Sequence, residues 1–169
     1  MPSTLRPIDP CLITDNAFKL ISTDWMLVTA GNLQSYNTMT ASWGALGELW
    51  SKKIAICFVR PVRHTYSFLE KTDSFTLTFF DETYRDTLKL CGTKSGRDVD
   101  KMSLPGMTPI EGFTGSVYFS EARLVLDCRK IYTHDLDPEH FLDSKIHDEY
   151  PDKDYHRMYI GEIIQCLTR

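Results

Sequence analysis

The chain has 169 residues, of which 42% are hydrophobic, 25% charged and 12% aromatic, and its formal net charge at pH 7 is −4. This length predicts one domain over residues 1–169, large enough to bury a substantial core. The acidic balance argues against binding to nucleic acid or to an anionic membrane, because both need a basic surface.

The first part of the chain contains short strand-like runs separated by polar segments. Residues 1–20 are expected to form an extended N-terminal arm, and the polar stretch 31–37 is expected to be a loop. Runs of apolar, aromatic or small residues predict strands over residues 24–30, 38–44 and 53–59. The last of these must stop at Arg60-Pro61, because proline cannot continue a strand ladder. A short helix is expected over residues 62–71.

Residues 74–80 alternate phenylalanine and leucine with serine and threonine, which predicts a half-buried strand. Asp81 is a suitable N-cap for a helix that ends before Gly92. The S-x-x-D spacing of Ser95 and Asp98 predicts another short helix. Residues 105–115 contain two prolines and three glycines and are expected to form a loop.

The strongest strand signal covers residues 117–131, where apolar and charged residues alternate as in an antiparallel strand with one wet face. Asp137-Pro138-Glu139 provides an N-cap, a proline and an acid for another helix. A final strand is expected over residues 155–167. Long strands with short helices predict a closed or sandwiched sheet with small helices at its rims.

The chain contains five cysteines, with no C-x-x-C pair, and no signal peptide or transmembrane run. These features predict free thiols in a reducing compartment, the cytoplasm. Cys91 stands beside Lys94 and Arg97, which would lower a thiol pKa. The alternative is that Cys91 is a small structural residue at a helix end.

Three segments carry candidate chemistry. The run NTMTASWG from Asn37 to Gly44 offers amides, hydroxyls and small residues to a flat heteroaromatic ligand; the alternative is a polar turn. The run RPVRHT from Arg60 to Thr65 combines two arginines with a helix start, so it is either an anion site or a solvated helix end. The run CGTKSGRD from Cys91 to Asp98 is either a phosphate-binding loop or a plain connection.

His156 opens the final strand beside an arginine, and it either faces a ligand or is an ordinary residue, exposed at the surface or satisfied within the protein. The five histidines show no H-E-x-x-H or i,i+4 pairing, so no metal site is expected. The chain also lacks the G-x-G-x-x-G run of a Rossmann site.

Taken together, the segments NTMTASWG, ICFVRPVRHT, SFTLTFF and CGTKSGRDVDK resemble, in order and spacing, the flavin reductase-like, FMN-binding split-barrel family. The ending DYHRMYIGEI resembles that family's closing D-H strand, with Tyr155 inserted between Asp154 and His156. The resemblance covers residues 22–164. It implies a mainly β fold, a six-stranded antiparallel split barrel with short peripheral helices, that forms a homodimer with one FMN per subunit.

The resemblance also implies site residues. Those along the isoalloxazine and ribityl groups, partly through their backbones, are Asn37, Met39, Thr40, Ala41 and Ser42, with Trp43 near the ring. Those near the ribityl phosphate are Arg60, Arg63, His64 and Thr65, completed by Lys94 and Ser95. His156 stands on the nicotinamide or substrate side.

The implied function is an oxidoreductase that passes a hydride from NADH or NADPH to FMN and electrons onward to an acceptor. The flavin carries that chemistry, so no catalytic acid or base is required. One alternative is a flavoredoxin-like electron carrier that exchanges electrons with a protein partner. Another is a module that holds FMN without turnover. A relative that has lost flavin is disfavoured by the intact run from Asn37 to Ser42.

Overall fold

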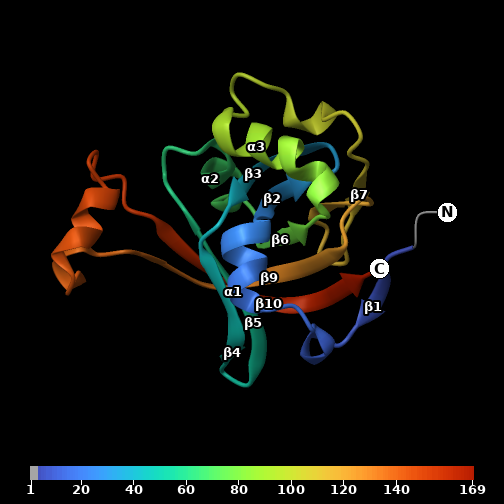
Figure 1. Ribbon diagram of the computed structural model, residues 1–169, viewed down its shortest axis with the longest axis horizontal. Coiled ribbons are helices and arrows are strands. Elements are labelled where there is room, and N and C mark those ends of the chain that lie inside the picture. The colour runs from blue at the N-terminus through green and yellow to red at the C-terminus, as the bar shows by residue number, and fades with distance from the viewer. Residues whose placement is uncertain (1–3) are drawn as a thin grey trace.

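A computed structural model describes residues 4–169, and residues 1–3 of the expected N-terminal arm lie outside the described part (Figure 1). The main sheet has eight strands in the order β3-β2-β6-β9-β10-β5-β4, with β1 paired to β10, and β7 and β8 form a separate hairpin. All pairings are antiparallel. The strands are β1 (Arg6–Ile8), β2 (Met26–Asn32), β3 (Ser35–Ala41), β4 (Gly44–Leu49), β5 (Lys52–Val59), β6 (Ser74–Phe79), β7 (Pro109–Glu111), β8 (Val117–Phe119), β9 (Leu124–Asp135) and β10 (Arg157–Thr168).

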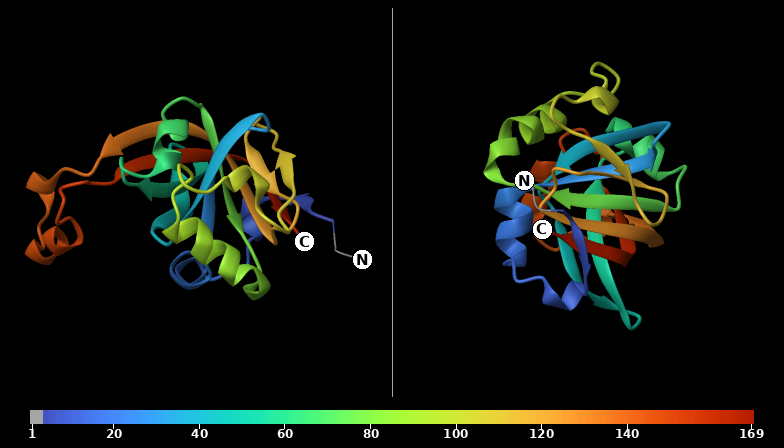
Figure 2. Two further views of the ribbon diagram at one scale, coloured as in Figure 1. Left: turned by 90° about the horizontal axis from the view of Figure 1, so that it is seen from above. Right: turned by 90° about the vertical axis from the view of Figure 1, so that its right-hand side faces the viewer.

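The helices are short and lie outside the sheet (Figures 1 and 2). The α-helices are α1 (Ala17–Lys19), which continues into a π-helical turn (Leu20–Asp24), α2 (His64–Leu69) and α3 (Arg85–Thr93). The 3-10 turns are at Pro10–Leu12, Glu82–Tyr84, Lys101–Ser103, Pro138–His140 and Ser144–Glu149. No helix within residues 4–169 is long and apolar enough to cross a membrane.

The two outermost strands of the sheet, β3 and β4, follow one another in the chain. Only Ser42 and Trp43 lie between them. The sheet therefore curls until β3 comes close to β5, and the chain itself bridges the opening. This is the predicted split-barrel class, with eight strands in the main sheet rather than six.

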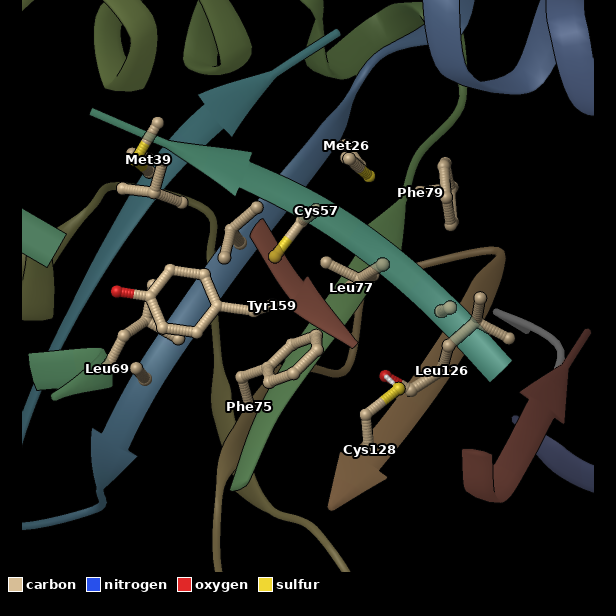
Figure 3. Close-up of a cluster of buried hydrophobic side chains, with 14 of the residues drawn as sticks. Met26, Met39, Cys57, Leu69, Phe75, Leu77, Phe79, Leu126, Cys128 and Tyr159 are labelled. Atoms are coloured by element: carbon tan, nitrogen blue, oxygen red, sulfur yellow. Dashed lines mark hydrogen bonds between the residues drawn. The ribbon is translucent and has the colours of Figure 1, made fainter. Parts of the chain in front are cut away.

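The barrel interior holds the first of two buried clusters, which Figure 3 shows. Phe75, Leu77 and Phe79 of β6 pack there with Tyr159 of β10. The second cluster lies on the other face of β2, β6 and β9, beneath α3 and the β7–β8 hairpin, and includes Leu88. Strands β2, β6 and β9 are therefore buried on both faces.

The prediction that residues 74–80 form a strand is confirmed, but the predicted wet face is wrong. Thr76 and Thr78 are fully buried, because the β7–β8 hairpin and α3 cover that side of β6. The hydroxyl of Thr76 donates to the Val117 carbonyl. The wet face predicted for residues 117–131 is confirmed at Arg129, which is exposed, and is wrong at Asp127, which is fully buried.

Several element boundaries differ from the predictions. Residues 31–37 are not a loop, because β2 and β3 form a hairpin whose turn is only Leu33-Gln34. The Asn32 side chain caps this turn by accepting hydrogen bonds from the backbone N–H groups of Gln34 and Ser35, at 3.0 and 3.1 Å. The single strand predicted over 117–131 is broken at residues 120–123 into β8 and β9.

Other corrections concern the helices. The extended arm expected over residues 1–20 is helical from Ala17 onward, and the helical turns continue to Asp24; the Asn16 side chain caps them by accepting from the Lys19 backbone N–H. Ser95 caps a single turn rather than a helix, by accepting from the Arg97 backbone N–H at 3.1 Å. Gly92 lies inside α3 rather than beyond it. The strands predicted over 53–59 and 155–167 and the helix within 62–71 are confirmed.

Residues 136–156, here called the projecting loop, extend away from the barrel between β9 and β10 (Figure 2, left). Its two ends are held together at the sheet. Arg157 makes a two-pronged ion pair with Asp135 at 2.6 and 3.0 Å, and the Leu136 backbone N–H donates to the His156 carbonyl at 2.9 Å. The loop thus starts from a fixed base.

Candidate functional site

A buried polar cluster lies between β3, α2 and the segment that follows α3. Asn37 is only 4% exposed, and its Nδ2 donates to the Thr65 hydroxyl at 2.7 Å. The turn after Ser95 rests directly on Asn37: a Cβ on Gly96 would overlap Asn37 Oδ1 and lie 2.9 Å from a ring carbon of His64. The fold therefore brings together Asn37, His64, Thr65 and the Ser95 turn.

The cations around this cluster donate to carbonyl oxygens and not to carboxylates. Arg63 donates to the carbonyls of Cys91 and Gly92 at 3.4 and 3.2 Å, and Arg97 donates to that of Val62 at 3.1 Å. Neither arginine has an acidic partner within residues 4–169. Burial, and then the charge of Arg60, lowers the pKa of Arg63.

Lys101 is a member of this cluster that the sequence analysis did not select. Its side chain is 3% exposed, and Nζ donates to the Thr38 and Cys91 carbonyls, both at 2.9 Å. Burial lowers the pKa of Lys101 to about 8. Lys101 begins the 3-10 turn Lys101–Ser103. The Asp100 side chain caps this turn by accepting from the Met102 backbone N–H, and the turn directs the Lys101 side chain inward.

One polar atom of the cluster is without a partner. His64 Nδ1 is buried and makes no hydrogen bond within the described residues. Burial lowers the pKa of His64, and the charges of Arg97 and Lys101 lower it further. A positive cluster with an orphaned ring nitrogen and no carboxylate fits an anion such as a phosphate.

The segment from Met39 to Trp43 offers backbone rather than side chains. Met39 is 4% exposed and packs in the barrel interior (Figure 3), and the Thr40 hydroxyl donates to the Leu88 carbonyl. Because β3 is an edge strand, the backbone groups on its outer side are not paired with another strand. Because β3 ends at Ala41 and β4 begins at Gly44, the backbone groups of Ser42 and Trp43 are also not part of a strand pairing.

An apolar groove of about 730 Å³ begins at Ser42 and Trp43. It runs between α1, β4 and the projecting loop, and its main side chains are Phe18, Trp43, Leu46, Phe58, Ile146 and Tyr150. Trp43 is 44% exposed and forms part of its wall. Sites for flat organic ligands commonly have volumes of roughly 300–1,000 Å³ and such apolar walls.

Arg60 is placed differently from Arg63. Its guanidinium donates to Asp154 at 2.7 Å and to the Glu149 carbonyl at 2.8 Å, and it lies 4.8 Å from the Tyr150 ring centroid. Arg60 therefore fastens the projecting loop to the end of β5. Lys94 is exposed just past α3 and forms no ion pair within residues 4–169.

His156 lies beside the groove and is buried, with 8% of its surface exposed. Its Nδ1 is 2.7 Å from the Tyr150 hydroxyl, and its ring centroid is 5.0 Å from that of Trp43. Burial, and then the charge of Arg60, lowers the pKa of His156 to about 4. The imidazole is therefore neutral at neutral pH. It is not a surface residue, and its hydrogen bond with Tyr150 satisfies one of its two ring nitrogens.

The cysteines are unpaired, as predicted. Cys91 is fully buried, and burial raises the pKa of its thiol. The structural interpretation of Cys91 is therefore correct, and the reactive one is wrong. Within residues 4–169, no three His, Cys, Asp or Glu side chains are arranged to hold a metal ion.

The fold and the site define a split-barrel protein with an apolar groove beside an edge strand and a buried cationic cluster. Solved structures with this fold include a flavoredoxin from Methanosarcina acetivorans, at 20% identity and TM-score 0.70, covering 86% of this chain and 68% of that one. The FMN-binding protein of Thermus thermophilus with bound p-hydroxybenzaldehyde has 18% identity and TM-score 0.70, covering 97% and 79%. An NADH:FAD oxidoreductase from Streptomyces globisporus has 16% identity and TM-score 0.65, covering 85% and 74%.

The family model of the flavin reductase like domain matches residues 18–169. The chain belongs to the flavin reductase-like domain family. A search of curated proteins gave no match.

Proposed function

We propose that this protein binds FMN and acts as a flavin reductase-type oxidoreductase, passing electrons from NADH or NADPH through FMN to an acceptor. Membership of the flavin reductase-like family supports this proposal. Bound FMN would supply the hydride and electron chemistry, while the protein binds and orients it. Free thiols agree with a cytoplasmic location.

The observation that carries the proposal is the cationic cluster of Arg63, Arg97 and the buried Lys101, which pairs with no carboxylate within residues 4–169 and lies beside the edge strand that leads to the groove. Arg63, His64 and Thr65 would hold the phosphate, together with the Ser95 turn. The outer backbone edge of β3 and the linker residues Ser42 and Trp43 would hold the ring. At ~3.3 Å per residue, the extended chain from Asn37 in β3 to Ser42 just beyond it spans about 17 Å, comparable to an extended FMN.

We also propose that the protein is a homodimer. Phe18, in the groove wall, is 85% exposed, and Leu142, on the projecting loop, is fully exposed. Phe18, Trp43 and Ile146 are exposed and line the same apolar groove, and a contiguous apolar surface of this kind favours an interface. Light scattering coupled to gel filtration should give twice the 19.5 kDa chain mass. A monomer at micromolar concentration would contradict this part of the proposal.

The test of the flavin proposal is an absorption spectrum of the protein reconstituted with FMN, followed anaerobically after addition of NADH or NADPH. Bleaching of a bound flavin by either nucleotide would support the reductase function. A bound flavin that only a reduced protein partner bleaches would indicate an electron carrier instead, and one that nothing bleaches would indicate a non-redox module. Failure to retain FMN, with no turnover of free FMN, would contradict the proposal, and tighter binding of FAD would contradict the choice of FMN.

A further inference from the structure

Tyr150 lies on the projecting loop, yet it is only 5% exposed. Its hydroxyl is 2.7 Å from Nδ1 of His156, and both residues are buried. Tyr150 also forms part of the groove wall, on the opposite side from the barrel. A hydrogen bond within the projecting loop therefore connects Tyr150 with the histidine at the end of the loop, next to Trp43.

Packing on several sides fixes the orientation of the Tyr150 ring. The Arg60 guanidinium lies 4.8 Å from its centroid, and Arg60 also holds the neighbouring Glu149 carbonyl. The rings of Phe141 and Tyr155 lie 5.9 and 5.1 Å away, centroid to centroid. With its ring held in this way, Tyr150 keeps its hydroxyl on Nδ1.

The proton of this hydrogen bond belongs to Tyr150. Burial raises the pKa of Tyr150, so its hydroxyl stays protonated, while His156 is neutral and has a single N–H. If Nδ1 were that N–H, the buried hydroxyl hydrogen of Tyr150 would be left without an acceptor within residues 4–169. The hydroxyl therefore donates to Nδ1, and the imidazole proton is on Nε2.

The second ring nitrogen of His156 is available. Nε2 makes no hydrogen bond within the described residues, and it is not among their fully buried unpartnered atoms. It belongs to the ring whose centroid lies 5.0 Å from that of Trp43, a residue that lines the groove. An Nε2–H in this position is a neutral donor suited to a carbonyl oxygen of a flat ligand.

We propose that Tyr150 is a positioning residue, which fixes His156 in the tautomer that presents an Nε2–H donor to a carbonyl oxygen of the ligand beside Trp43. The identity of that ligand as a flavin rests on the proposed function. The tautomer itself does not, because it follows from contacts within the protein. The two parts are therefore tested separately.

The tautomer is measured by long-range proton–nitrogen NMR on protein with ¹⁵N-labelled histidine and no flavin, with His156→Gln used for assignment. Nδ1 of His156 should be unprotonated and Nε2 protonated in the unmodified protein. Tyr150→Phe keeps the ring and removes only the hydroxyl. It should lower the ratio of the two tautomers by about fivefold, the equivalent of the ~1 kcal/mol of a neutral hydrogen bond. Tyr155→Phe, whose ring also packs on Tyr150, should leave the ratio unchanged.

A protonated Nδ1 in the unmodified protein, or equal ratios in it and in Tyr150→Phe, would overturn the role of Tyr150. The first of these outcomes needs no variant, so the proposal remains falsifiable if the variant is unstable. FMN is then added, and its binding is followed by flavin fluorescence. Binding should shift the Nε2–H signal of His156, and binding without a shift would overturn the donor role. Absence of binding would contradict the proposed function and leave the tautomer result standing.

Discussion

Lys101 allows a quantitative test of the buried cationic cluster that does not depend on any ligand. Lys101→Met keeps the length of the side chain and removes its charge, while the carbonyls of Thr38 and Cys91 lose their donor. The lost hydrogen bonds change the stability by an amount that is nearly independent of pH. The lost charge changes how stability varies with pH.

The direction follows from the pKa of Lys101, which is about 8 in the folded protein against an ordinary value of 10.5. Below pH 8 the amine is charged in both states, and its burial destabilises the fold in full. Between pH 8 and 10.5 the folded state loses the proton first, so the unfolded state binds more protons and stability rises. The gap is worth about 3 kcal/mol at ~1.4 kcal/mol per pKa unit.

The assay is urea unfolding of both proteins under reducing conditions at intervals from pH 7 to pH 11. Both proteins also carry Cys91→Ala, because burial raises the pKa of the Cys91 thiol and the charge of Lys101 lowers it. Titration of the other buried thiols and tyrosines also changes the stability in this range, but it is common to both proteins and cancels in the difference. The free energy of unfolding of the protein that retains Lys101, relative to Lys101→Met, should rise by about 3 kcal/mol across pH 8 to 10.5. Parallel curves would refute the conclusion that Lys101 is a charged amine held in a buried site.

Three further outcomes are expected. Arg63→Ala should weaken FMN binding at least about tenfold in a fluorescence titration, because a charge-assisted hydrogen bond contributes ~1.5–3 kcal/mol. The matched control is Arg129→Ala, which removes an exposed arginine far from the cluster in sequence. Equal affinities of Arg63→Ala and the unmodified protein would remove Arg63 from the phosphate site. Gly161→Ala should reduce the free energy of urea unfolding by about 1–3 kcal/mol, because the added Cβ would lie 2.7 Å from atoms of two core side chains. An unchanged urea midpoint would show that these side chains move aside without cost. Iodoacetamide should label the exposed Cys11 of the folded protein and spare Cys91, and mass spectrometry showing early labelling of Cys91 would contradict its burial.

The strands that could be predicted from the sequence are those with a nearly continuous run of apolar residues, which indicates a buried strand. The run KIAICFV and the final run of β10 are apolar enough to indicate strands without any knowledge of their neighbours. Strand β4 gives no such signal, since Gly44–Leu49 contains two glycines and lies partly exposed at the sheet edge. Asn37 is polar, and the sequence around it predicts a loop, because only the tertiary contact with the Ser95 turn shows that Asn37 is buried.

The types of residue in the candidate site could be predicted from the sequence, but the contacts that each residue makes could not. Two arginines at one strand end look equivalent in the sequence. In the structure Arg63 joins the buried cluster, whereas Arg60 pairs with Asp154, 94 positions away. Lys101 resembles any surface lysine until the packing of β3 and α3 around it is known. Tyr150 likewise gives no sequence signal, since its role depends on the path of the projecting loop.

The base of the projecting loop also has a consequence for how the molecule tolerates a break in its backbone. Asp135 and Arg157 hold the loop ends together, and β10 beyond them is paired with both β9 and β5. A single peptide bond cut near the exposed Lys145 would leave two pieces joined along the β9–β10 ladder, the longest of the sheet, and along the β5–β10 ladder. The chain thus contains a natural division into complementary fragments, at a point where protein engineers could split the molecule and reassemble it.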